Sequence, residues 1–293
     1  METVPIVFVD SVAELLDPKT LENLADSNLN CLWSQIADVH KRERKYYSLE
    51  LWQTEEDVYC AFNKLLQIRL EYMDIRDLQK IESRFLRLPS INDSSQRAIP
   101  EKRKVLKFGR DEFPKFEKLI HRHFPGKVGE CYSSNTKYQE FMLRALHGKI
   151  YLTFINIANT CPLAEDFVKD QIENSAFLRV VNFIGEWDWG SMLEHVKKFC
   201  FRPGRERTVF GDVTLDRDFY QDLRDFWRAN DDFAFEIYTA LYEEDAVKAI
   251  MPRDGESYCL MDESRRTIVH QMKDSLYVHN CPRRPSCEYF DPS

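Results

Sequence analysis

The stretch FLRVVNFI at residues 177–184 is the clearest strand in this sequence, and the segments around it decide the fold. Six of its eight residues are apolar and three are β-branched, a composition typical of a parallel strand that neighbouring elements cover. Residues 192–201 follow with apolar side chains at helical spacing. The local unit that the sequence predicts is therefore a strand followed by a helix.

This unit recurs along the chain. Short apolar runs begin at intervals of 22 to 30 residues, near Lys104, Lys127, Lys149, Phe177, Arg207 and Phe233. Helix-patterned segments lie between them, over residues 113–123, 138–147, 164–175, 192–201 and 218–230. A period of this length is typical of solenoids and is similar to leucine-rich-repeat geometry. We predict an irregular α/β strand–helix repeat; a simple open α/β sheet is the alternative.

Both ends of the chain depart from this rhythm. Apolar residues between Val4 and Trp33 recur every three to five places, which predicts two or three short helices. Residues 46–52 and 58–62 predict a hairpin, and short alternating runs over 257–278 predict a terminal β-hairpin that caps the repeat. The predicted domains are a helical head (1–41), a connecting β-hairpin and helix region (42–101), an α/β repeat-like body (102–280) and a tail (281–293). Residues 90–101 are expected to form a loop.

Composition excludes several classes of partner. The 293 residues include 41 Lys and Arg against 49 Asp and Glu, and this net charge of −8 argues against broad binding to nucleic acid or anionic membranes. The first twenty residues lack the basic start of a signal peptide, so we expect a cytoplasmic or nuclear protein with reduced cysteines. The basic runs at 41–45 and 102–107 are interpreted as solvated helix ends; contact with phosphate or an acidic partner is the alternative.

Sequence motifs give little support for catalysis. The common glycine-rich phosphate loops, the serine nucleophile elbow and the zinc-protease His-Glu-x-x-His pattern are all missing. Asp216 and Asp218 stand where a helix should begin, so capping explains them better than acid–base chemistry. His270, His279, Cys281 and Cys287 have an unusual spacing for zinc, and we expect no metal site and no cofactor.

A pair of tryptophans marks a second kind of candidate site. Trp187 and Trp189 follow the strand at 177–184 together with two acidic residues. Exposed indoles at such a position would anchor a protein partner. Ordinary packing between repeat units is the alternative.

The N-terminal pattern resembles an F-box, a motif of apolar helical positions that opens with Leu-Pro and ends near a Trp. The matching positions are Val4-Pro5, Phe8-Val9, Val12, Leu15-Leu16, Asp17-Pro18, Leu21, Leu24-Ala25 and Trp33. With the opening VPIVFVDSV, the strand-like YYSL, Cys161-Pro162 and Gly185-Glu186-Trp187, the chain resembles the divergent, greatly expanded nematode F-box-like families. Members of these families pair such a head with a repeat-like body.

This resemblance implies a head that docks an apolar stripe onto a Skp-type adaptor of a cullin-RING ubiquitin ligase. The residues it assigns to adaptor binding are Pro5, Phe8, Val12, Leu15, Leu16, Leu21 and Leu24. The body would hold an unknown protein target, which makes the chain a non-catalytic substrate receptor. The alternatives are a repeat-type binding or scaffold protein without ligase coupling, whose N-terminal helices pack only on its own body, and an enzyme with an unrecognised site.

Overall fold

The computed structural model describes most of the chain. The ranges it describes are residues 4–16, 18–27, 31–64, 71–123, 129–133, 139–203, 206–230, 235–239, 244–250, 253–254, 257–261, 265–272 and 275–282, the last four as backbone only. No helix within those ranges has both the length and the apolar character needed to traverse a lipid bilayer. The chain forms two compact units, Met1–Thr153 and Phe154–Ser293, which are described one at a time.

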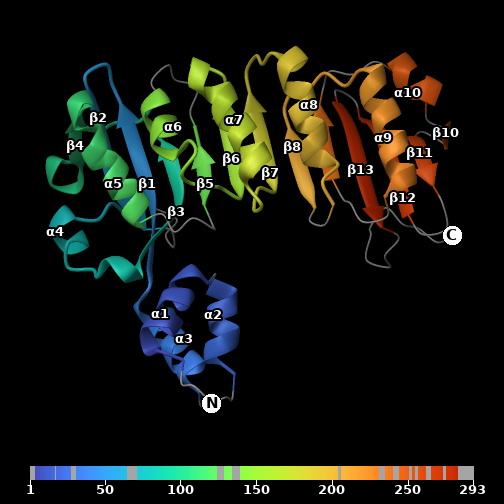
Figure 1. Cartoon of the computed structure of the whole chain (residues 1–293). Helices are drawn as coiled ribbons and strands as arrows, with labels where there is room; N and C mark the ends of the chain where they lie inside the picture. Colours follow the sequence, from blue (N-terminus) through green and yellow to red (C-terminus); the bar gives the residue numbers. More distant parts are fainter. Residues whose placement is uncertain are drawn as a thin grey trace. The chain divides into compact units, whose positions relative to one another are not determined.

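The first unit begins with the predicted helical head (Figure 1). Its helices are α1 (Ile6–Leu15), α2 (Pro18–Ala25) and α3 (Leu32–Glu43). Pro18 suits the first turn of α2 because its φ is already helical and its missing N–H would have no partner there. Ala13, Leu21 and Ala37, one from each helix, are buried together. The head therefore has a small core of its own.

A mixed sheet follows the head directly. Its strands are β1 (Lys45–Gln53), β2 (Asp57–Lys64), β3 (Leu86–Asp93), β4 (Leu106–Gly109) and β5 (Glu130–Tyr132), in the spatial order β5-β3-β1-β2-β4. The antiparallel pair β1–β2 is the predicted hairpin, whereas β3 runs parallel to both β1 and β5. Between the strands lie α4 (Ile75–Leu78), α5 (Phe113–His123), α6 (Glu140–Leu146) and the 3-10 turns Ser83–Phe85, Lys102–Lys104 and Arg110–Glu112.

Strand alternation gives this sheet one apolar face. Pairing aligns a row of buried side chains across four strands: Phe62, Leu49, Ile91 and Cys131. Helix α5 contacts β3 and β4 and buries Phe116, whose ring centroid lies 4.9 Å from that of Phe141 in α6. The residues one position along each strand point to the other face.

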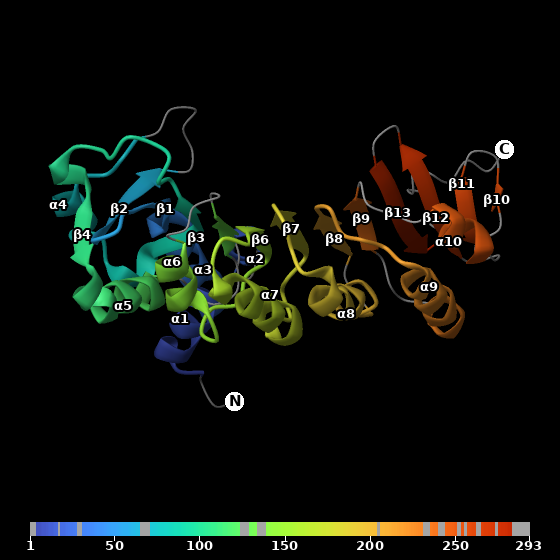
Figure 2. The same cartoon turned by 90° about the horizontal axis from the view of Figure 1, so that it is seen from above.

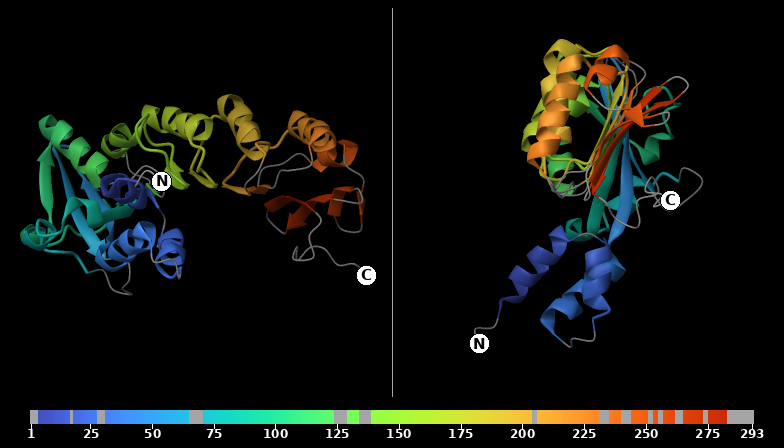
Figure 3. Two further views of the ribbon diagram at one scale, coloured as in Figure 1. Left: turned by 60° about the horizontal axis from the view of Figure 1, so that its bottom comes forward. Right: turned by 90° about the vertical axis from the view of Figure 1, so that its right-hand side faces the viewer.

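The second unit contains the predicted repeat. Four parallel strands, β6 (Phe154–Ala158), β7 (Val180–Ile184), β8 (Arg207–Phe210) and β9 (Phe235–Thr239), alternate with α7 (Pro162–Asn174), α8 (Trp189–Cys200) and α9 (Arg217–Ala229). These three helices cover one face of the strands (Figures 2 and 3). Ile155 and Ile157 of β6 pair with Val181 and Phe183 of β7 in register, and all four are buried. The α/β repeat-like body is confirmed.

Antiparallel strands close the end of this unit. After α10 (Glu244–Ile250) come β10 (Arg253–Asp254), β11 (Ser257–Met261), β12 (Arg265–Met272) and β13 (Ser275–Pro282). They pair in sequence, and β13 returns to lie antiparallel to β9. The predicted terminal hairpin is thus present within a longer meander that occupies the exposed edge of β9.

The region between residues 86 and 101 differs from expectation. We expected a loop from residue 90, but β3 continues to Asp93 and pairs with β1 and β5. Strands on both sides of residue 101 therefore share one sheet, and the division into compact units falls after Thr153 instead of at 101/102. The predicted tail at 281–293 begins inside β13, and residues 283–293 lie outside the described residues.

The close contact between Gly211, which directly follows β8, and Phe183 leads to a stability prediction. Gly211 has φ +130°, and a Cβ placed there would lie 2.7 Å from the carbonyl oxygen of Phe183. We expect Gly211→Ala to lower the free energy of unfolding by about 3 kcal/mol, because the cost of a positive φ and the cost of the Cβ overlap add together. Gly148→Ala is the control: φ is +65° with open space around it, so about 1 kcal/mol is expected. Equal losses in urea denaturation would contradict this account.

Candidate functional site

The first turn of α1 carries a contiguous exposed apolar surface. Val4 is 45% exposed, Ile6 58%, Val7 71% and Phe8 56%. With the exposed Pro5 they form a surface that we call the α1 patch. Four of the six large apolar side chains that are strongly exposed among the described residues lie here. Single exposed apolar residues are ordinary, but a contiguous group marks an interaction surface.

Helix α1 is apolar on more than one side. Val9 and Ala13 face inward and are buried, while the α1 patch faces solvent. Polar residues of α1 begin only at Asp10, so its first turn is apolar on both sides. One side of α1 is covered by the head, so the other is available to a partner. Phe8 keeps one contact with the head, with its ring centroid 6.5 Å from that of Trp33 in an edge arrangement.

The structure separates the residues that were predicted to bind an adaptor. Pro5 and Phe8 belong to the α1 patch, and Val12 is half-buried. Leu16 and Leu24 are half-buried against the head core, and Leu21 is 1% exposed inside it. Leu21 therefore stabilises the head and cannot contact a partner, which corrects the prediction. The side chain of Leu15 lies outside the described part of the structure.

Three patch residues are absent from the set that the F-box resemblance assigns to adaptor binding. They are Val4, Ile6 and Val7, and they are more exposed than most of the residues in that set. The signal that could have identified them is the uninterrupted run VPIVF at residues 4–8. An amphipathic helix would have carried polar residues within that turn.

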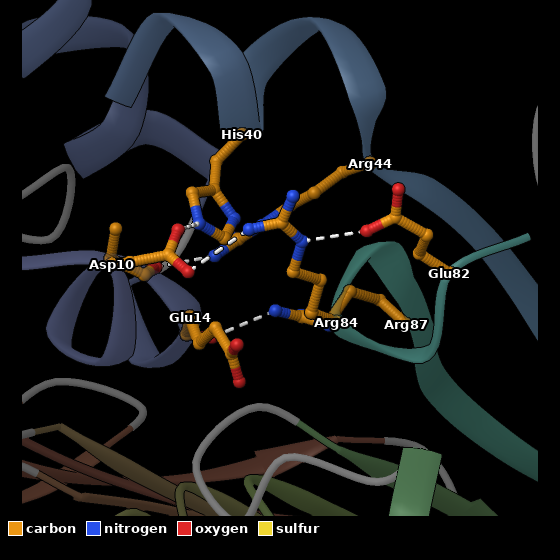
Figure 4. A network of polar contacts seen from close by, with 8 residues as sticks. Asp10, Glu14, His40, Arg44, Glu82, Arg84 and Arg87 are labelled. Carbon is orange, nitrogen blue, oxygen red and sulfur yellow. Dashed lines mark hydrogen bonds and ion pairs between the residues drawn. The ribbon is translucent and has the colours of Figure 1, made fainter. Parts of the chain in front are cut away.

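The C-terminal end of α1 is held by two arginines (Figure 4). Arg44, which links α3 to β1, donates to the carbonyl oxygens of Leu16 at 2.7 Å and Ala13 at 2.5 Å. Arg87 of β3 donates to the carbonyl oxygen of Glu14 at 3.2 Å. Carbonyls at a helix C-terminus lack partners within the helix and carry partial negative charge, so guanidinium groups suit them.

Both arginines are buried. The other four residues of the run at 41–45 are exposed, as expected of a solvated helix end, whereas Arg44 is only 6% exposed. Burial, and then the neighbouring charge of Arg44, lower the pKa of Arg87 to about 10, so Arg87 stays charged at neutral pH. The head is thereby joined to the sheet of its own unit by charge-assisted hydrogen bonds.

A second cluster flanks this joint. His40 Nε2 donates to Asp10 Oδ1 at 2.9 Å, and Arg84 donates to Asp10 Oδ2 at 3.1 Å and to Glu82 at 2.9 Å. Burial lowers the pKa of His40 despite its bond to Asp10, so the contact is a hydrogen bond from a neutral imidazole. Burial alone would raise the pKa of Asp10, but the bonds from His40 and Arg84 hold it below its usual range.

The predicted tryptophan site is largely internal. Trp187 is 7% exposed, and its Nε1 donates to the carbonyl oxygen of Ile184 at 3.1 Å. Trp189 is half-buried at the start of α8. Both rings contact Phe183 edge-on, at centroid distances of 5.0 and 5.1 Å. The packing alternative therefore holds for Trp187, which cannot anchor a partner.

The remaining candidates from the sequence are an acidic helix start and a set of metal-ligand residues. Asp216 accepts a hydrogen bond from the Phe219 amide at 2.8 Å and so caps α9, as predicted. No group of three or more His, Cys, Asp or Glu residues in the described ranges could hold a metal ion. The side chains of His270, His279 and Cys281, and all of Cys287, lie outside those ranges. Comparison of the chain with protein-family models, curated proteins and solved structures found no match.

The arginine anchors generate a stability prediction. We expect Arg44→Met to lower the free energy of unfolding by about 2–3 kcal/mol, because two carbonyls lose a charged donor while the volume is kept. Arg42→Met is the matched control: Arg42 is well exposed and its ion pair with Asp38 lies at the surface, so a change below about 0.5 kcal/mol is expected. Equal effects in urea denaturation would show that Arg44 does not hold α1.

The buried histidine generates a pH prediction. The folded state lowers the pKa of His40, so the unfolded chain gains a proton first as the pH falls below about 6.5, and stability is lost. Asp10 adds a further loss near pH 4, because its pKa is also lowered by folding. The groups that act on His40 are Asp10, Arg44 and Arg87.

His40→Gln keeps a donor for Asp10 but does not titrate. We expect thermal unfolding of this variant to lose less stability between pH 7 and pH 5.5 than the unchanged protein does. His195, whose pKa burial also lowers, is present in both proteins and cancels in the comparison. Parallel stability curves would show that His40 does not contribute.

Proposed function

We propose that this chain is a substrate receptor of a Skp-cullin-F-box type ubiquitin ligase, with the α1 patch as its adaptor-binding surface. The single observation that carries the proposal is the exposure of this apolar surface at the N-terminal part of the head, where the F-box resemblance begins. The function is non-catalytic: the head binds a Skp-type adaptor, and the remainder of the chain holds a protein target.

The physical basis is docking of an apolar helix into a groove of the partner. Val4, Ile6, Val7 and Phe8 are presented from one helical turn and the residues just before it. Each such side chain contributes on the order of 2 kcal/mol when it is buried in an interface. The leucines of α2 act indirectly, because Leu21 and Leu24 hold α1 in place through the head core.

The arginine joint supports the same function. A receptor must hold its target at a fixed position relative to its adaptor. This requires a head that does not move freely on the sheet of its own unit. Arg44 and Arg87 provide this within the first unit by bonding three carbonyl groups, two in the last turn of α1 and one at its C-cap residue. A head on a flexible linker would need no such buried contacts.

The test is binding of the full chain to a Skp-type adaptor. We expect Ile6→Glu with Val7→Glu to weaken binding at least a hundredfold, because two anchors of about 2 kcal/mol each are replaced by charges. Stability should be kept, because both side chains are exposed and acidic residues are favoured in the first turn of a helix. Calorimetry with purified adaptor measures the affinity, and thermal unfolding checks the fold.

The matched control is Asn23→Glu with Gln35→Glu, which adds the same charge at exposed positions of α2 and α3. It should bind the adaptor as the unchanged chain does. If the folded, unchanged chain fails to bind an adaptor that binds an established F-box protein, the proposal is wrong. A repeat-type binding or scaffold protein would then be the better description.

A further inference from the structure

The sheet of the first unit has a polar pocket on the face opposite its apolar row. The pocket has a volume of about 440 Å³, within the range of small-ligand sites. Strand pairing builds its floor from two rows of side chains. The first row is Asn63, Ser48, Ser90 and Glu130, and the second contains Glu50, Asn92 and Tyr132.

Glu50 begins the second row of this floor and is 3% exposed. Its carboxylate accepts hydrogen bonds from Ser48 Oγ at 3.0 Å, from Asn92 Nδ2 at 2.8 Å and from Ser94 Oγ. A carboxylate offers about four acceptor positions, so one remains for a ligand. The three neutral donors fix the orientation of the group without neutralising its charge.

The charge of the pocket is not balanced at its floor. Among the described residues, no Lys, Arg or His lies within ion-pair distance of Glu50, and Glu130 accepts its bond from the Tyr132 hydroxyl at 2.9 Å. The basic residues of the lining are at its edge, where Lys64 pairs with Glu71 at 3.2 Å and Arg97 is exposed to water. Buried charge is costly without a counter-charge, so a cation would be favoured inside.

The geometry points to a binding site for the basic side chain of an arginine, with Glu50 as the principal ion-pair partner and Glu130 as the second carboxylate. A guanidinium can donate to the remaining acceptor position of Glu50, and Tyr132, in the same row of the floor, offers a ring for it to lie against. A neutral hydroxylated ligand would leave the charge of Glu50 uncompensated. That this arginine belongs to a target protein rests on the proposed function; the affinity for the side chain does not.

The probe is a peptide, acetyl-Gly-Arg-Gly-amide, titrated into the full chain at low salt and followed by NMR. The same peptide with citrulline replaces the guanidinium by a neutral group of nearly equal shape. We expect at least tenfold weaker binding of the citrulline peptide. Free L-arginine forms a second arm: binding tighter than that of the capped peptide would assign the pocket to the amino acid instead of to a protein segment, and would overturn the target-protein part of the inference.

The protein variants test the same contacts. Glu50→Gln should weaken the arginine peptide at least tenfold, and Glu130→Gln, at the half-exposed edge of the floor, gives a second reading if Glu50→Gln fails to fold. Glu186→Gln, an exposed acid in the second unit, is the matched control and should bind normally. Equal binding of the citrulline peptide, or full affinity in folded Glu50→Gln, would overturn the inference.

These outcomes are separable from those of the adaptor experiment. The chain with Ile6→Glu and Val7→Glu should bind the arginine peptide as the unchanged chain does, because the α1 patch is not part of the pocket. Loss of peptide binding in that variant while it remains folded would contradict a pocket that acts on its own.

Discussion

The bonds from Arg44 and Arg87 to the end of α1 are the contacts on which the arrangement of the first unit depends. Each guanidinium is buried and donates to backbone carbonyls at the C-terminal end of the helix. The two residues come from elements that are far apart in sequence, the α3–β1 junction and β3, so the contact forms only when head and sheet fold together. These hydrogen bonds fix the orientation of α1, and with it which side of the helix is covered and which side is exposed.

Periodicity was a good guide where strands and helices have one consistently apolar face. The segments expected to be helical between residues 113 and 230 correspond to α5 through α9, and the apolar runs between them are strands. Periodicity failed at β3. Its residues Ser90 and Asn92 suggested a loop, yet they belong to a strand and line the pocket on one of its faces. Polar side chains on one face of the strand removed the signal by which that strand would have been recognised.

The candidate site was predictable in residue type but not in orientation. The apolar pattern of the head correctly indicated short helices, and Pro5 and Phe8 do lie on the α1 patch. Where five consecutive residues are apolar, as in VPIVF at residues 4–8, periodicity cannot say which side packs inward. Leu21 and Phe8 are equally apolar in the sequence, but Leu21 is buried and Phe8 is exposed, a difference that only the tertiary contacts determine.

The antiparallel meander on β9 also constrains how such a chain can change in length. A parallel strand–helix unit can follow another parallel unit with the same pairing on both edges, so duplication of a unit between β6 and β9 preserves every hydrogen-bonding pattern. β9 is different, because its outer edge is committed to a strand of opposite direction, and the meander ends in the two-residue strand β10. Strand–helix units can therefore be inserted only between existing units of the body. Relatives with more or fewer units should keep the same closing segment.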